Sequence, residues 1–509
     1  MLNINKKKGE QKEGYGFATQ EVNNTQNLLQ IEEKRTMSIE EMFSEKGFCF
    51  GKSYSKPTEH NKAYWNLESK KTLNYSIAII GGSGSGKTRY AVHVIDYLGR
   101  QNKNVIVMDV QGDMHVPGEQ VFKLTRRNND VGFNYFTFTK DEDNGGPISN
   151  ANMIIELYKN SVMDRGFGPI QKAVFKQAII DCYRSKGIYE EDESTWDNEL
   201  PTPAYFEQFI QKILGNASSN KITDFTQLLN TMIDLKGKVS QSDEESKEKI
   251  EKKMSEEIGR FRDLSSKFED YLLENKHSAF FEGIKFDEKN FDISFYYIPS
   301  NFKALSTLYT YVKIMADCPL FGDKPFPEIK GVVRFDISGY TTYGKPEEAI
   351  FFINYVLTMF FRSIKERGEY RFLPKEYREK HGEFCDSFCF VDESKLILPS
   401  GPNKENPYHI INRIVTEARK YGGGMGIISQ RLNHFSGELI NSIYTKVILK
   451  SEQSDVDNAT KILGIKAKDN LEPKILFSHI SNSKDGVAVV GTTGGLYDSL
   501  VTPWYVKND

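Results

Sequence analysis

One stretch of this chain, from Ile77 to Thr88, constrains its fold more than any other. It reads Ile-Ala-Ile-Ile-Gly-Gly-Ser-Gly-Ser-Gly-Lys-Thr. The four apolar residues, mostly β-branched, predict a buried strand. The Gly/Ser loop that follows matches G-x-x-x-x-G-K-[ST], and the residues from Thr88 to Ile95 predict a helix. Strand, glycine-rich loop and helix in this order predict a phosphate-binding loop. The alternative is a glycine-rich turn that matches the pattern by chance.

Each residue type in this loop suits a nucleotide triphosphate. Glycines let backbone N–H groups point inward around phosphate oxygens, at a helix N-terminus whose dipole favours negative charge. Lys87 is predicted to contact the β- and γ-phosphates, and Thr88 to hold Mg²⁺ through its hydroxyl. The predicted ligands are therefore ATP and Mg²⁺. The predicted nucleotide-binding residues are Gly81, Gly82, Ser83, Gly84, Ser85, Gly86, Lys87, Thr88 and Arg89.

A second part of the site is predicted far downstream, where an apolar strand ends in two carboxylates. The segment Ser387 to Glu393 reads Ser-Phe-Cys-Phe-Val-Asp-Glu. In phosphate-binding-loop enzymes the first such acid supports Mg²⁺, which makes Asp392 the predicted metal residue. The neighbouring acid can accept a proton from the attacking water, which makes Glu393 the predicted general base. A strand that ends in a solvated Asp-Glu pair is the alternative.

Composition limits the class of protein. The chain has 509 residues, enough for two or three domains, and 39% of them are hydrophobic, as in a globular protein. The net charge of −3 excludes a globally basic nucleic-acid binder, so a DNA channel would need local basic patches. The five scattered cysteines favour reduced thiols over a metal site. Neither a membrane-length apolar run nor a signal core is found, and we expect a cytoplasmic protein.

The order of elements predicts an α/β fold with an insertion. Strands are expected at 104–109, 291–298, 332–337, 424–430 and 445–450, and helices at 170–183, 235–275, 348–365 and 410–421. Strands that alternate with helices predict a mostly parallel sheet. The expected organisation is a flexible arm (1–36), a lead-in anchored by Phe43, Phe48 and Phe50 (37–75), a first core part (76–149), a helical insertion (150–285) and a second core part with a tail (286–509).

Four places resemble the HerA branch of the FtsK–HerA superfamily of ring-forming, DNA-pumping ATPases. Two are the phosphate-binding loop and the Phe388–Glu393 strand described above. The third is Asp-Val-Gln-Gly-Asp from Asp109 to Asp113, which is similar to the family's Asp-x-x-Gly-acid motif. The most discriminating is Glu-Ala-Arg-Lys-Tyr-Gly at 417–422, followed by Ile-Ile-Ser-Gln-Arg at 427–431. The resemblance covers roughly residues 75–505 and implies a RecA-like P-loop NTPase core.

The resemblance also implies roles for two further residues. Gln430 matches the polar sensor of the γ-phosphate, the alternative being an ordinary Gln at a strand end. Arg419 matches the arginine that such rings project into a neighbour's site, with Arg431 as the reserve candidate and a surface arginine as the alternative. A planar, permanently charged guanidinium suits the spread charge of a transferring phosphoryl group. An arginine that acts in trans implies an oligomer, and in this superfamily a homohexamer.

The leading functional hypothesis is a hexameric DNA translocase or helicase with a partner nuclease or other effector, in a setting such as anti-phage defence. One departure weakens the nuclease link, because residues 1–75 leave little room for the N-terminal β-barrel of HerA proteins. Two alternatives stay open: a ring scaffold that regulates a nuclease or an NAD-consuming enzyme, and a conjugation or secretion motor. Predicted basic loops for DNA in the ring pore contain Lys123, Arg126, Arg127 and Lys345, and solvated surface charge is the equal alternative.

Overall fold

The computed structural model divides the chain into two compact units. Unit 1 comprises Met1–Val105, Met114–Pro117 and Glu369–Asp509, and unit 2 comprises Ile106–Asp113 and Gly118–Gly368. The structure describes residues 43–44, 47–53, 62–70, 72–127, 131–142, 145–162, 167–217, 248–260, 291, 294–341, 346–399, 406–450, 487–492, 495–496 and 500–501.

The sheet of unit 1 carries the phosphate-binding loop. Its central strands are parallel and follow the order β8 (Ser387–Val391), β9 (Gly423–Ser429), β4 (Ile77–Ile80) and β10 (Thr445–Ile448). Strand β11 (Val487–Thr492) pairs with β10 in the antiparallel direction. All residues of these four parallel strands are buried, which explains why their sequences are mostly apolar and do not alternate between apolar and polar residues. The predicted α/β fold is confirmed.

The register brings the ends of these strands to one edge. Ile80 lies opposite Ser429 on one side and opposite Ile448 on the other. Val391 lies opposite Ile427, so the residue that follows β8 lies beside the last residues of β9. Because parallel strands end at the same edge, the loops after β4, β8, β9 and β10 all meet there.

The lead-in segment packs on the helix that follows the phosphate-binding loop. Strand β2 (Gly47–Ser53) pairs with β1 (Phe43–Ser44) and β3 (Lys62–Trp65). Phe48 and Phe50 are buried, and the Phe48 ring contacts Tyr90 and Tyr97 of helix α3 (Lys87–Arg100). The lead-in segment is therefore anchored by aromatic side chains, as predicted.

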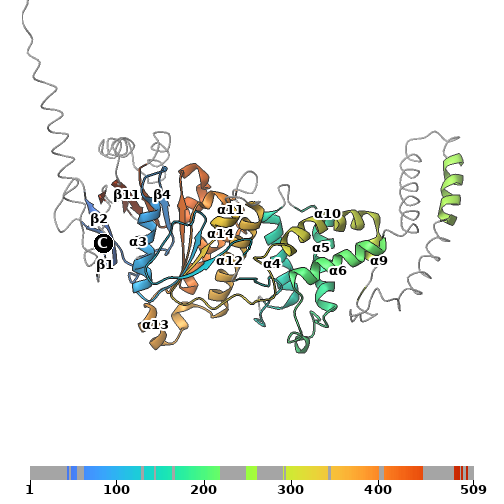
Figure 1. Cartoon of the computed structure of the whole chain (residues 1–509), viewed down its shortest axis with the longest axis horizontal. Coiled ribbons are helices and arrows are strands. Elements are labelled where there is room, and N and C mark those ends of the chain that lie inside the picture. The colour runs from blue at the N-terminus through green and yellow to red at the C-terminus, as the bar shows by residue number, and fades with distance from the viewer. Residues whose placement is uncertain are drawn as a thin grey trace, which may run out of the picture. The chain divides into compact units, whose positions relative to one another are not determined.

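Unit 2 has its own aromatic core. Strand β7 (Val332–Asp336) pairs in parallel with β6 (Gln120–Lys123) and lies next to β5 (Asn104–Asp109). Helix α12 (Pro346–Glu366) packs Phe352 against Phe335 of β7 and against Phe133. The unit continues into the helices α4 (Gly146–Ser161), α5 (Pro169–Arg184), α6 (Pro203–Ala217) and α10 (Pro299–Ala316), of which α6 and α10 lie side by side (Figure 1).

One predicted strand of unit 2 is wrong. Residues 291–295 alternate apolar and polar side chains, yet the structure has the short helix α9 (Ser294–Tyr297) in this segment. Tyr296 is fully buried, and its hydroxyl donates a hydrogen bond to Asp181 of α5 at 2.6 Å. Pro299 then starts α10. Packing of one aromatic side chain on a helix therefore overrides a period of two.

Short elements complete the described part of the chain. They are η1 (Glu193–Thr195), α11 (Ser338–Thr341), η3 (Tyr370–Phe372), α13 (Lys375–His381), η4 (Ser394–Leu396), α14 (Ile410–Glu417), η6 (Ala418–Tyr421), η7 (Leu432–His434), α15 (Gly437–Ser442), β12 (Gly495–Leu496) and β13 (Leu500–Val501). The expected arm (1–36) and most of the expected helix at 235–275 lie outside the described residues, although 248–260 are helical. The expected domain boundaries stay predictions.

The structure also bears on the expectations about cysteine thiols and membrane spans. All five cysteines are buried and carry free thiols, and burial raises the pKa of Cys182 and Cys385. Over the residues that the structure covers, every helix is too short or too polar to cross a membrane.

Candidate functional site

The loop between β4 and α3 is fixed at its start by both neighbouring strands. The Gly81 N–H donates to the Ser429 carbonyl at 3.2 Å, and the Gly82 N–H donates to the Lys450 carbonyl at 2.6 Å. A Cβ on Gly81 would lie 2.6 Å from Ser85 Oγ and 2.9 Å from Leu449 Cβ. No residue larger than glycine fits there, because both contacts are closer than a Cβ tolerates. The predicted glycine at the first loop position therefore has a packing reason.

The second half of the loop prepares the start of α3. Gly86 has φ +87° and precedes the helix, and the Tyr90 N–H makes the first helical bond to its carbonyl at 2.9 Å. The amides before Tyr90 have no acceptor within the helix, as at any helix start. Lys87 Nζ donates to the Gly82 carbonyl at 3.1 Å, so its ammonium lies across the loop. The Lys87 ammonium and the backbone amides of the loop therefore lie at one helix N-terminus, an arrangement that suits the phosphates of a nucleotide.

The two downstream acids follow β8, at the same edge of the sheet as this loop and separated from β4 by β9. Asp392 follows β8 and is 3% exposed, and Glu393 is next. The Gln430 Nε2 donates to Glu393 Oε1 at 2.6 Å. Ser394 Oγ donates to the Ile428 carbonyl at 2.8 Å and ties the turn to β9. The structure thus brings together Glu393 and Gln430, which are 37 residues apart in sequence.

Glu393 is held in an unfavourable backbone conformation. Its φ of +45° and ψ of +46° are left-handed, and only Asn102 shares a positive φ among the described non-glycine residues. This conformation costs about 1 kcal/mol or more in a residue with a Cβ. Such strain persists where the surroundings over-determine a residue, and it gathers at functional sites. It therefore supports a functional role for Glu393.

Oxygen ligands for Mg²⁺ are available at the same edge. The Thr88 hydroxyl comes from the first turn of α3, and the Asp392 carboxylate comes from the end of β8. Hard oxygen donors of this kind, few in number, match the way proteins bind Mg²⁺ together with phosphates. Both residues thus fit the predicted metal role.

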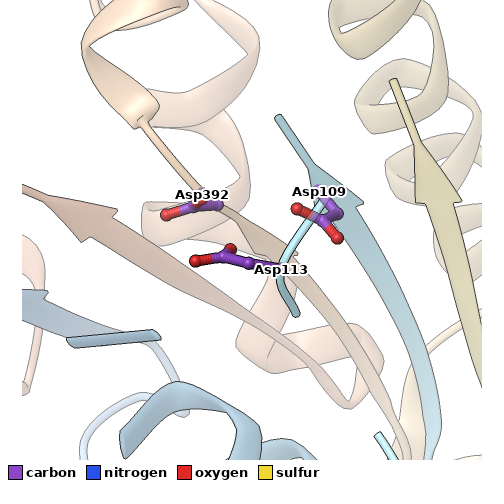
Figure 2. Close-up of side chains that lie close together, drawn as sticks. All are labelled: Asp109, Asp113 and Asp392. Atoms are coloured by element: carbon purple, nitrogen blue, oxygen red, sulfur yellow. The ribbon is translucent and has the colours of Figure 1, made fainter. Parts of the chain in front are cut away.

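The Asp-x-x-Gly-acid motif forms a tight turn after β5 in unit 2. Asp109 Oδ1 accepts the Gly112 N–H at 2.7 Å, and Oδ2 accepts Arg334 Nη1 at 2.9 Å. Arg334 also forms an ion pair with Glu119 at 2.8 Å. Carboxylate oxygens of Asp109 and Asp113 lie within 4.8 Å of each other. Figure 2 shows the side chain of Asp109 at the end of β5 and that of Asp113 in the turn that follows. The turn therefore brings two carboxylates close together, and hydrogen bonds hold Asp109 in place.

Arg419 lies at the opposite edge of the unit 1 sheet. It belongs to η6, directly before β9, whereas Gln430 and the loop lie after β9 and β4. A strand of seven residues spans about 20 Å. An arginine side chain cannot bridge that distance, so Arg419 does not reach the nucleotide loop of its own chain.

The turn that carries Arg419 is braced. A Cβ on Gly422 would lie 2.2 Å from the ring of the buried Tyr370. Lys420 Nζ forms an ion pair with Glu369 at 2.9 Å. The reserve candidate Arg431 is exposed and follows Gln430, at the edge that carries the loop. The two arginines therefore stand at opposite ends of one strand.

His93 makes the stability of this region depend on pH. It is 4% exposed in α3, and burial, followed by the charge of Arg89, lowers its pKa from 6.5 to about 4. The unfolded chain binds more protons between these values, so stability falls as the pH drops through that window. We expect a loss of about 2 kcal/mol from pH 7 to pH 5 through this group. His93→Gln should lack this loss in urea unfolding, and an identical pH dependence in both proteins would contradict the assignment.

The predicted basic loop is partly neutralised. Arg126 Nη2 forms an ion pair with the buried Glu348 at 2.6 Å, and its guanidinium lies 5.2 Å from the centre of the Tyr340 ring. Arg127 and Lys123 are exposed. Lys345 lies outside the described residues.

Two residues near the site escaped the sequence analysis as candidates. Ser429 precedes Gln430, and its hydroxyl lies 2.8 Å from Nδ1 of His434. A single histidine beyond a motif carries no pattern that sequence reasoning could use, whereas Ser429 stands inside the Ser-Gln-Arg motif.

Comparisons with known proteins agree with this geometry. No family model matches the chain. A stretch of 129 residues, 25% of this chain, is 29% identical to the DNA double-strand break repair helicase HerA of Pyrococcus furiosus. That stretch spans only 22% of the HerA protein.

Solved structures add the fold. VirB4 of Thermoanaerobacter pseudethanolicus aligns with a TM-score of 0.57 and 13% identity over 91% of this chain and 97% of that one. The bacterial conjugative coupling protein TrwB aligns less well, with a TM-score of 0.45 and 12% identity over 94% of this chain. At such low identity the VirB4 likeness concerns the fold alone. Together with the HerA stretch, it confirms the resemblance of this chain to the P-loop ATPases of the FtsK–HerA superfamily.

Proposed function

We propose that this protein hydrolyses ATP, and that it does so as a homohexameric ring that moves duplex DNA. The hydrogen bond between Gln430 and Glu393 beside the phosphate-binding loop carries the enzymatic part of the proposal. An acid and an amide that are joined in this way suit a residue pair that senses phosphate and activates water.

The chain's own residues divide the work. Loop amides and Lys87 would bind the β- and γ-phosphates, and Thr88 and Asp392 would hold Mg²⁺, which would offset phosphate charge. Glu393 accepts the proton of the attacking water at its carboxylate. Gln430 orients that carboxylate through its amide N–H.

The position of Arg419 supports the ring. A residue about 20 Å from its own loop can contact phosphate only in another subunit. Head-to-tail contacts form a ring where the rotation between subunits closes, and the resemblance to the superfamily implies six subunits. The DNA partner, an effector such as a nuclease and a role in defence are the parts of the proposal that rest on resemblance alone.

Phosphate release measured with Mg²⁺ and with excess EDTA tests the enzymatic part. We expect Mg²⁺-dependent hydrolysis that duplex DNA stimulates. Hydrolysis that ignores DNA but responds to an effector protein would favour the ring scaffold. Absence of both nucleotide binding and hydrolysis would overturn the proposal.

DNA binding has its own expected signature. Phosphate contacts release counterions, and six subunits with one cation each predict a log–log salt slope of about −5. Arg126→Ala/Arg127→Ala should make this slope shallower, and most of the change should come from Arg127, since Glu348 already pairs with Arg126. Fluorescence anisotropy of a duplex, in the presence of a non-hydrolysable ATP analogue, measures both. No binding at low salt would remove the translocase and leave the scaffold.

A further inference from the structure

Ser429 is the point at which the nucleotide loop and the sensor residue join. It ends β9, is 1% exposed, and its carbonyl accepts the N–H of Gly81. The next residue is Gln430, whose amide binds Glu393. Ser429 therefore bonds to the first glycine of the loop through its main-chain carbonyl, and it directly precedes the residue that binds Glu393.

The hydroxyl of Ser429 is fixed by His434. Its Oγ lies 2.8 Å from His434 Nδ1, whereas the carbonyl of Arg431, a second acceptor, lies at 3.5 Å. His434 ends the turn η7, which the Phe435 N–H closes onto the Leu432 carbonyl at 3.1 Å. Leu432 and Phe435 are both buried. The imidazole thus sits on a turn that two apolar side chains anchor.

We propose that His434 is a positioning residue for ATP hydrolysis, which holds the Ser429–Gln430 segment so that Gln430 faces Glu393. This inference rests on the proposed function. Removing the imidazole leaves the buried hydroxyl with only the distant Arg431 carbonyl, and an unmade buried hydrogen bond is costly enough to turn the segment. Nucleotide affinity does not depend on this contact, because Lys87 and the loop amides remain.

Three variants test the proposal. His434→Leu keeps bulk and removes the hydrogen bond. His434→Asn restores it, because an amide atom of Asn stands two bonds from Cβ, as Nδ1 does, and can act as donor or acceptor. His381→Leu is the matched control. His381 ends α13, where its ring nitrogen bonds to the carbonyl of Asn102, and it precedes β8 rather than following β9.

The expected result separates kcat from binding. His434→Leu should lower kcat on the order of 10- to 100-fold, as misplacement of about 1 Å does, with an unchanged Kd for an ATP analogue. Hydrogen–deuterium exchange of the nucleotide-free protein should rise in peptides over 429–435, while exchange over 81–86 should stay as in the wild type. His434→Asn should reverse both changes, and His381→Leu should show neither.

Ser429→Ala guards against a variant that fails to fold. It removes the other partner of the same bond, so it should reproduce the loss in kcat, and the double variant with His434→Leu should add little. Wild-type kcat and exchange in either single variant would overturn the inference. An inactive wild-type protein would overturn the proposed function instead, and the exchange measurement would still decide whether His434 positions the segment.

Discussion

Glu393→Gln is expected to keep ATP binding and to stop hydrolysis. The glutamine carbonyl oxygen can still accept the hydrogen bond that Gln430 donates at 2.6 Å, so the turn keeps its geometry. An amide cannot accept a proton from water, and loss of a general base costs on the order of 10²- to 10⁴-fold in rate. Single-turnover phosphate release and equilibrium binding of a fluorescent ATP analogue measure the two properties separately.

The control for this variant is Glu376→Gln on α13. Glu376 is exposed, and the substitution removes the same charge at a distance from the loop. It should hydrolyse ATP at the wild-type rate. If Glu393→Gln also does so, Glu393 is not the base, and its left-handed backbone needs another explanation. If Glu393→Gln loses binding as well, the carboxylate has a role in holding the nucleotide.

Local patterns predicted the loop because its signals are contiguous. Strand β4, the glycines and α3 follow one another within a few residues, and each has one good conformation. The strand before Asp392 was predicted for the same reason, since a buried parallel strand needs a continuous apolar run. For both segments, the sequence motif, the predicted strand and the position at the sheet edge agree with the structure.

Contacts between distant segments were beyond the sequence. The hydrogen bond between Gln430 and Glu393 follows from the pairing of Val391 with Ile427, and no single segment contains that register. The strand predicted at 291–298 was wrong for a related reason, because Tyr296 bonds to Asp181 on another helix. The pairing of His434 with Ser429 spans only five residues, yet it depends on a turn that no motif announces.

The position of Arg419 leads to the second large effect. Arg419→Ala is expected to leave ATP binding intact and to lower hydrolysis on the order of 10³-fold, as loss of an arginine finger does. Arg413→Ala, which removes one exposed ion pair with Glu417 on α14, is the matched control and should retain activity. Arg431→Ala distinguishes the two candidate arginines. Arg431 lies at the sheet edge that carries the phosphate-binding loop of the same chain, so it would act within one subunit.

Mixing Arg419→Ala with Lys87→Ala subunits tests action across an interface. Lys87→Ala alone should abolish activity, since no other cation in the motif replaces its phosphate contact. In a mixed ring, an intact loop on an Arg419→Ala subunit can meet the intact arginine of a Lys87→Ala neighbour. Equal mixing makes about a quarter of head-to-tail interfaces productive, so activity should reappear although neither variant has any. Monomeric wild-type protein in light scattering, with full ATPase activity, would remove the arginine in trans. Activity that does not return on mixing would assign Arg419 to the folding of its own turn, where Tyr370 and Glu369 already hold it.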